Sequence, residues 1–324
     1  MLEKTLALLA DVRPGTWLPD DVECYDPAEL DAFGRLLSRL LYSPSSIRRL
    51  LQQKFGVTIT RADAYAEVPT IAELERSFAS PSLLTLEGVF PGNPAMVAEL
   101  DRLMKVSHEF DPPQTSSRAG EYAWQNGSFS FSDAMAYYAM IRTRRPRTIV
   151  EIGGGWHTRI AQMACARNGL GRIVCVEPNP GEFLEALEGT ELIRRRAQEV
   201  ETGFFSALLR DGDMLFIDSS HTVRHDGDCL HVYLRILPRL EASVSVQVHD
   251  INLPDTLSLS QMRDQQVFWN EQYLLYAYMS GNARTRAVYG SRYHMRHNPE
   301  LLDRFMHGRY RAGGASFWFE QERA

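Results

Sequence analysis

The sequence has 324 residues, of which 44% are hydrophobic and 23% are charged, and its formal net charge is −6. This is the composition of a globular protein with one large domain, or with one domain and an additional lobe. The weakly acidic balance lacks the basic surface that nucleic-acid binding requires. The apolar start of the chain is too short to span a bilayer and precedes no cleavage site, so we expect a cytoplasmic protein without membrane or nucleic-acid partners.

The first 110 residues are expected to be mainly helical, because their apolar residues recur at helical spacing between turn-forming residues. Asp26 and Pro27 are suitable for the start of the first of these helices, and Gly56 for the end of the second. A polar segment that carries several aromatic residues follows over 111–130. The predicted helices cover residues 26–42, 43–55, 70–78 and 90–110.

From residue 131 onward, short apolar segments alternate with helical patterns of 10–15 residues. This alternation predicts a parallel sheet with helices on both faces, a doubly wound α/β fold of the Rossmann-like type. After Pro254 we expect one more helix, over 267–282, and two strands that form an antiparallel hairpin. The strands are predicted at 148–152, 172–178, 192–200, 213–220, 243–251, 285–293 and 314–320.

These patterns suggest two domains: a helical N-terminal cap over 1–125 and a Rossmann-like catalytic domain over 126–324. The C-terminal hairpin is rich in aromatic residues and is a candidate interface for a homodimer. None of the four cysteines forms a C-x-x-C pair, which predicts buried free thiols in a reducing compartment.

A glycine-rich turn follows the first predicted strand, in VEIGGGWHT. Gly153 and Gly155 allow the backbone to turn sharply and to approach a ligand closely. Glu151 comes just before the turn, where its carboxylate is suited either to the amino group of a bound ligand or to fixing the turn itself. In doubly wound folds, ligands bind at the carboxyl ends of the strands.

Glu177 ends the second predicted strand, where a carboxylate can accept hydrogen bonds from the two hydroxyls of a ribose. The spacing E-x-G-x-G-x-H differs from the G-x-G-x-x-G pattern of NAD-binding proteins. The turn together with Glu177 therefore favours S-adenosylmethionine (SAM) as the nucleotide cofactor. Gln198 and Glu199 follow the third strand, at the position expected to recognise the adenine edge.

Several sequence segments, in this order, resemble the class I SAM-dependent methyltransferases of the methyltransferase-24 type. The resemblance covers about residues 126–282 and implies a Rossmann-like SAM-binding core, in part of the group with an N-terminal helical cap. It is specific for the family and poorly specific for the substrate. The segments are NGSFSFSDAMAYYAMIRTRRPRTI, TIVEIGGGWHT, RIVCVEPNP, AQEV, DMLFIDSSHT, LRILPRL, VHDINLP and WNEQYLL.

Asp218 ends the fourth predicted strand, and the resemblance places it beside the methionine part of SAM or beside the acceptor, with Ser219 next to it. A helix N-cap is the alternative role for Asp218. His221 lies three residues further on, at the mouth of the expected site. It is a candidate general base for an acceptor O–H or N–H, and a hydrogen-bonded histidine without a catalytic role is an equally good interpretation.

His249 and Asp250 end the fifth strand, and we expect His249 to be catalytic and Asp250 to bind the acceptor. A pair of strand-end aspartates such as Asp218 and Asp250 is similar to the Mg²⁺ ligands of metal-dependent O-methyltransferases. Those enzymes usually carry another Asp or Asn directly after the second aspartate, where this chain has Ile251. We therefore predict no metal.

Trp156 and His157 depart from the commoner family pattern, which has a small hydroxyl residue in place of His157. Trp156 is suited either to packing against the turn or to cation–π contact with the SAM sulfonium. We expect both residues, together with Thr158, to contact the cofactor. Tyr122 and Asn126 are expected to contact the substrate from the segment before the core.

The favoured function is methyl transfer from SAM to a small-molecule acceptor in specialised metabolism. The alternative is a SAM-consuming cyclase, in which the amine of SAM attacks its own Cγ to give azetidine-2-carboxylic acid and methylthioadenosine. A SAM-binding protein without catalysis is the third hypothesis, which the full set of motifs disfavours.

Overall fold

The computed structural model of the chain describes residues 27–79, 84 and 87–323, and it divides into two compact units, Met1–Arg76 and Ser77–Ala324. The predicted division into a helical cap over 1–125 and a catalytic domain over 126–324 stays a prediction. The first residues of the chain, and Cys24, lie outside the described part. Among the described residues, no helix is long and apolar enough to cross a membrane.

In the first unit, the predicted helices are present as α2 (Pro27–Leu41) and α3 (Ser45–Phe55), followed by the beginning of α4 (Ile71–Ala79). Gly56 ends α3 as predicted: its φ is 66°, and its N–H donates to the Gln52 carbonyl oxygen over 2.9 Å. A left-handed residue at this position satisfies a carbonyl that the helix leaves unpaired, and glycine adopts this conformation without a steric cost.

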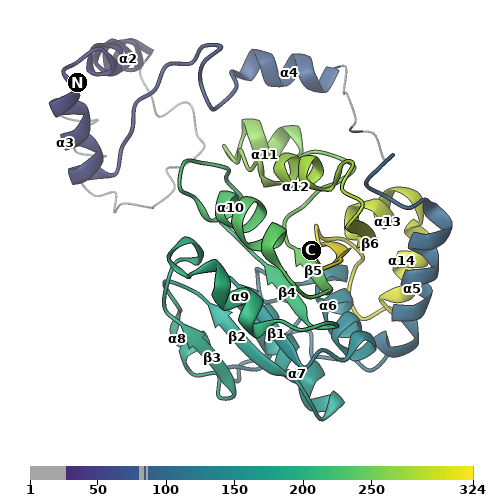
Figure 1. Cartoon of the computed structure of the whole chain (residues 1–324). Helices are drawn as coiled ribbons and strands as arrows, with labels where there is room; N and C mark the ends of the chain where they lie inside the picture. The colour runs from purple at the N-terminus through teal and green to yellow at the C-terminus, as the bar shows by residue number, and fades with distance from the viewer. Residues whose placement is uncertain (1–26, 80–83, 85–86, 324) are drawn as a thin grey trace. The chain divides into compact units, whose positions relative to one another are not determined.

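The second unit contains a seven-stranded sheet in the order β3-β2-β1-β4-β5-β7-β6 (Figure 1). Strands β1 to β5 are parallel, whereas β7 runs antiparallel to both of its neighbours. This confirms the predicted doubly wound core and the antiparallel C-terminal pair. The strands are β1 (Thr148–Ile152), β2 (Arg172–Val176), β3 (Thr190–Ile193), β4 (Met214–Ile217), β5 (Val244–Val248), β6 (Thr285–Gly290) and β7 (Phe317–Gln321).

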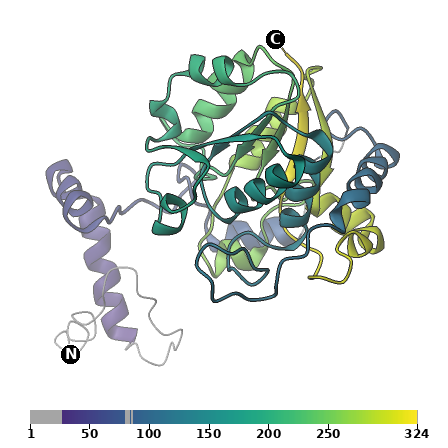
Figure 2. The same ribbon diagram turned by 90° about the horizontal axis from the view of Figure 1, so that it is seen from below.

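Helices cover both faces of this sheet (Figures 1 and 2), and an apolar core lies on each face. Alternate residues of one strand enter different cores, as the two-residue period of a strand requires: Val150 and Ile152 join one core, and Ile149 joins the other. The first core is completed by residues of α9 (Thr202–Leu208), α12 (Glu271–Met279) and the segment α10–η3–η4 (Asp228–Arg239). The second is completed by α5 (Asn93–Ser107), α6 (Phe131–Arg144), α7 (Trp156–Asn168) and α14 (Pro299–Phe305).

Smaller elements connect these layers. Within the helical segment Asp228–Arg239, η3 (Val232–Ile236) is a π-helical turn. The sixth strand ends at Gly290 and not at the predicted residue 293, because α13 (Ser291–His297) begins there. The polar stretch that follows, for which no element was predicted, contains the rest of α13 and α14. Three free cysteines are buried, as predicted: Cys165, Cys175 and Cys229. The remaining elements are α8 (Glu182–Glu185), η2 (Ala197–Glu199) and α11 (Leu259–Arg263).

A buried carboxylate attaches α6 to the segment that enters β7. Asp133 accepts hydrogen bonds from the Ala315 N–H (2.8 Å), the Ser316 N–H (2.9 Å) and the Ser291 hydroxyl (2.6 Å). A Cβ on Gly314 would collide with this carboxylate, so the segment passes it at a glycine whose φ is 98°. Two backbone N–H groups and one hydroxyl thus stabilise a carboxylate that burial without partners would disfavour.

We expect D133N to lower the free energy of unfolding by at least about 2 kcal/mol, because one amide group cannot accept all three hydrogen bonds and its own N–H groups would face donors. Urea unfolding measures this change. D101N, which alters an exposed aspartate on α5, is the matched control and should change stability by less than about 0.5 kcal/mol. Equal unfolding midpoints for the two variants would show that Asp133 does not anchor α6.

Candidate active site

The glycine turn brings the end of β1 against the end of β4. Gly153 has a φ of 90°, and a Cβ at this position would collide with the Asp218 carbonyl oxygen. A Cβ on Gly154 would collide with the Leu184 side chain, whereas Gly155 has more space around it. The two glycines that the close packing requires are therefore Gly153, which was predicted, and Gly154, which was not.

Glu177 lies beside this turn at the end of β2, as predicted. One carboxylate oxygen accepts a hydrogen bond from the Gly154 N–H (3.3 Å), and the other accepts one from the Asn179 N–H (2.8 Å). The side chain is half-buried. These backbone donors fix the orientation of a carboxylate at the position where the ribose of a nucleotide is expected.

Glu151 is buried in β1, two residues before Gly153. Its side chain is fully buried, and its two carboxylate oxygens accept hydrogen bonds from the Tyr137 hydroxyl (2.7 Å) and the Thr158 hydroxyl (2.6 Å). Burial raises the pKa of Glu151 to about 7, although the hydrogen bonds from Thr158 and Tyr137 lower it. Of its two predicted roles, these contacts support fixing the turn, and a contact with cofactor stays a prediction for Glu151 and Thr158.

His157 and Trp156 both begin α7, and their side chains have different surroundings. His157 is buried and stacks on Phe216, with ring centroids 4.1 Å apart, and neither ring nitrogen has a hydrogen-bond partner among the described residues. Burial lowers the pKa of His157 to about 3, so the ring is neutral. Trp156 is half-buried, and its ring centroid lies 4.2 Å from that of Phe183 and 6.2 Å from that of Tyr122.

A cluster of carboxylates and imidazoles occupies the ends of β4 and β5. The Nε2 atom of His221 lies 3.2 Å from Asp218 Oδ1 and 3.4 Å from Asp250 Oδ2. The Nδ1 atom of His249 lies 3.5 Å from the same Asp218 oxygen, and its Nε2 atom lies 3.4 Å from Asp133 Oδ2. Both aspartates remain about 30% exposed (31% for Asp218 and 29% for Asp250), whereas both imidazoles are buried.

The charges in this cluster stabilise one another. Burial by itself lowers the pKa of His221, but hydrogen bonds to Asp218 and Glu271 outweigh this effect and raise it to about 10. Burial likewise opposes the proton on His249, and Asp218 holds the pKa of that ring well above its usual range. Burial by itself raises the pKa of Asp218, but the two imidazoles outweigh this effect and hold it well below its usual range. Both imidazoles of the cluster therefore favour their protonated form.

Asp218, His221 and Asp250 also have the chemistry of a metal site, because their ligand atoms lie within 4.8 Å of one another. In the structure, however, the His221 imidazolium itself lies between the two carboxylates and supplies a positive charge there. The carboxylates are thus neutralised by a protein cation, and the predicted absence of a metal remains a prediction.

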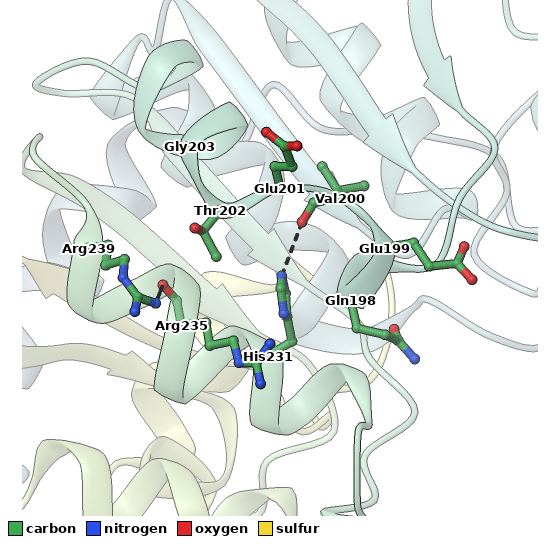
Figure 3. Close-up of a pocket in the computed structure, with 9 residues that line it drawn as sticks. All are labelled: Gln198, Glu199, Val200, Glu201, Thr202, Gly203, His231, Arg235 and Arg239. Carbon is green, nitrogen blue, oxygen red and sulfur yellow. Dashed lines mark hydrogen bonds between the residues drawn. The ribbon is translucent and has the colours of Figure 1, made fainter.

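Gln198 and Glu199, predicted at the adenine edge, lie on η2. Glu199 pairs with the Arg196 guanidinium (2.5 Å), and the Gln198 side chain donates to the Asp226 carbonyl oxygen (3.3 Å). Both border a surface cavity of about 590 Å³ on the side of α9 and α10, which neither Gly154 nor Glu177 lines (Figure 3). The cavity is lined by Gln198, Glu199, Val200, Glu201, Thr202, Gly203, His231, Arg235 and Arg239.

Tyr122 and Asn126, the predicted substrate contacts, organise the segment before α6. Tyr122 is 1% exposed, and its hydroxyl donates to the Phe129 carbonyl oxygen over 2.7 Å. The Asn126 side chain donates to the same oxygen over 2.9 Å and accepts from the Phe129 N–H over 2.9 Å. These bonds shape the loop, and contact with a substrate stays a prediction for both residues.

Two carboxylates that contact the cluster, Asp133 and Glu271, were not predicted from the sequence, and neither was Trp269. Glu271 is 50 residues from His221 in the chain, yet its Oε2 lies 2.9 Å from His221 Nδ1. The signal that could have indicated it was the segment WNEQYLL, which carried the family resemblance but received no role.

Comparison with known proteins gives a family match. Residues 150–251 match the family model described as a methyltransferase domain. An uncharacterised protein of Archaeoglobus fulgidus is 27% identical over 186 residues, which cover 54% of this chain and 82% of the relative.

Residues 150–251 form a class I methyltransferase domain. Its cofactor is S-adenosylmethionine, as predicted. Similar solved structures include a putative O-methyltransferase from Klebsiella pneumoniae, at 15% identity and a TM-score of 0.36, covering 74% of this chain and 94% of that chain. Another is the O-methyltransferase TomG from Streptomyces achromogenes, solved with SAM, at 16% identity and a TM-score of 0.34, covering 78% and 96%.

The buried Glu151 of this methyltransferase domain makes stability depend on pH. The folded protein keeps the Glu151 proton up to about pH 7, whereas the unfolded chain loses it near the ordinary value of 4.5. The folded state therefore binds more protons between these two values, so its stability falls as the pH rises through this window, by up to about 3 kcal/mol. Below and above the window this contribution is constant.

We expect E151Q to remove this dependence, because the neutral amide cannot ionise. The measurement is the difference in unfolding free energy between wild type and E151Q, from urea titrations at pH 5, 6, 7 and 8. As the pH rises, the unfolding free energy of wild type should fall relative to that of E151Q. Parallel stability curves across this range would show that Glu151 titrates at its ordinary pKa in the folded protein.

Proposed function

We propose that the protein transfers the methyl group of SAM to a small-molecule acceptor in a biosynthetic reaction. The observation that carries the proposal is the cluster of Asp218, His221, His249 and Asp250 at the ends of β4 and β5. It adjoins the glycine turn, because the Asp218 carbonyl oxygen packs directly against Gly153. A methyltransferase needs polar groups at this position to hold the acceptor atom beside the cofactor.

The residues near the turn suit the cofactor. The backbone approaches closely at Gly153 and Gly154, where a Cβ would not fit, and Glu177 presents a carboxylate held by two backbone N–H groups. SAM supplies a methyl group that its sulfonium already activates. We assign Glu177 to the ribose hydroxyls, and the two glycines to close contact with the cofactor.

The acceptor is assigned to Asp218 and Asp250, the partly exposed carboxylates of the cluster. Each has an oxygen near His221 Nε2, and each carboxylate can still accept a hydrogen bond from an acceptor O–H or N–H. His221 already carries a proton at neutral pH, so its first role is to hold the two carboxylates in place and not to act as a free base. His249 supports Asp218 from the other side.

A product analysis tests the reaction. The purified protein is incubated with SAM and EDTA, alone and with a panel of amines, phenols and alcohols, and products are identified by mass spectrometry. We expect S-adenosylhomocysteine and a methylated product only when an acceptor is present. Methylthioadenosine formed from SAM alone would contradict methyl transfer and support the cyclase. Turnover that requires Mg²⁺ in place of EDTA would contradict the metal-free assignment.

The ribose assignment of Glu177 makes a separate prediction. E177A should weaken S-adenosylhomocysteine binding at least about tenfold, because it removes charge-assisted hydrogen bonds of about 1.5–3 kcal/mol each. Isothermal titration calorimetry measures the affinity. E182A, an exposed glutamate five residues along the chain, is the matched control and should bind like wild type. An unchanged affinity in E177A would refute the assignment.

A further inference from the structure

The segment Trp269–Glu271 makes contacts that neither the cofactor assignment nor the acceptor assignment uses. It lies at the start of α12, outside the residues that match the methyltransferase domain. His221 has a φ of 56°, a left-handed conformation that non-glycine residues adopt only where their surroundings impose it. Its carbonyl oxygen accepts hydrogen bonds from the N–H groups of Asn270 (3.0 Å) and Glu271 (3.1 Å). The beginning of α12 thus holds the backbone of His221.

The side chains of the same segment hold the residues around it. The Asn270 side-chain oxygen accepts a hydrogen bond from the Val223 N–H over 2.6 Å. The Trp269 ring lies against the His221 imidazole, with centroids 4.8 Å apart. An indole ring at this distance attracts an imidazolium cation and restricts the rotation of its ring.

Glu271 makes the strongest of these contacts. Its side chain is 1% exposed, and its Oε2 atom lies 2.9 Å from His221 Nδ1 and 2.7 Å from the donating Ser219 hydroxyl. Its Oε1 atom accepts a hydrogen bond from the Tyr233 hydroxyl over 3.0 Å. Three donors thus fix a carboxylate that contacts neither Asp218 nor Asp250 in the described structure.

This arrangement determines which way the imidazole faces. Because Nδ1 is engaged by Glu271, Nε2 is directed to the opposite side of the ring, toward Asp218 and Asp250. Carboxylate–histidine pairs of this kind fix the orientation of a catalytic ring without contacting the reactants themselves.

We propose that Trp269–Asn270–Glu271 is the positioning element of the active site, and that Glu271 is the positioning residue that aims His221 at the two acceptor-binding carboxylates. The inference rests on the proposed function for its catalytic consequence, but the position of the ring can be tested without an acceptor. It extends the site to a helix that the methyltransferase-domain match does not include.

The first experiment observes the His221 ring directly. In protein with ¹⁵N-labelled histidine rings, a Nδ1–H group that donates to a buried carboxylate gives a strongly downfield proton resonance, which H221Q assigns by its loss. We expect E271Q to abolish this resonance or to shift it markedly upfield, and Y233F, which removes only one donor to Glu271, to shift it less. E300Q, an exposed glutamate on α14, is the isosteric control and should leave it unchanged.

The second experiment uses the acceptor that the product analysis identifies. E271Q should lower kcat about 10–100-fold, the usual effect of losing an orienting partner, with less than about threefold change in the KM for SAM. Y233F should show a smaller loss in kcat with the same KM pattern. This readout separates positioning from a general loss of structure, which would also weaken SAM binding.

If E271Q does not fold, Y233F decides both experiments. An unchanged His221 resonance in a folded variant would overturn the inference, and so would a wild-type kcat or a loss confined to KM. Failure of the proposed function looks different: the wild-type protein would make no methylated product, while the resonance would still respond to E271Q.

Discussion

The Asp218 carboxylate lies between two imidazole rings, and the candidate site depends on this arrangement. Charges removed from water are stable only when they are paired, and His221 and His249 need further partners behind them. Those partners are Glu271 on α12 and Asp133 on α6, which come from opposite faces of the sheet. The charges of the site are therefore balanced only when α6 and α12 pack on the sheet. Because both helices lie outside residues 150–251, this segment does not contain every residue that the site requires.

The positions of the main site residues were predictable because they follow from where strands end. Glu177 and Asp218 come directly after apolar segments and Asp250 comes two residues after one, and parallel strands bring their carboxyl ends to one edge of the sheet. The apolar segments also predicted most of the strands, but the third was misplaced: it lies at Thr190–Ile193 and not at 192–200, of which residues 197–199 form η2. For the other strands, the local sequence pattern and the tertiary structure agree.

The surroundings of Glu151 and the presence of Glu271 were harder to predict, for different reasons. Glu151 shares a strand face with Ile149, so the two-residue period could have placed it toward α6 and away from the ligand edge. No such period links Glu271 to His221, because their proximity depends on how α12 packs beside η3. The burial of His157 was likewise hidden, since a residue that follows a glycine turn can face either the ligand or the interior. Because His157 stacks on Phe216, the histidine that replaces the family's small hydroxyl residue helps to pack α7 against the sheet.

The π-helical turn η3 determines which side chains of the helical segment Asp228–Arg239 face the site. A π turn holds one residue more than the α-helical turn that it replaces, and it shifts the facing of every residue on one side of it. Tyr233 lies in this turn and reaches Glu271, whereas Arg235 faces the surface cavity. Removing one residue would restore the α-helical repeat and rotate the neighbouring side chains by about 100°. The hydrogen bond between Tyr233 and Glu271 therefore depends on the length of this helix as well as on the identity of residue 233.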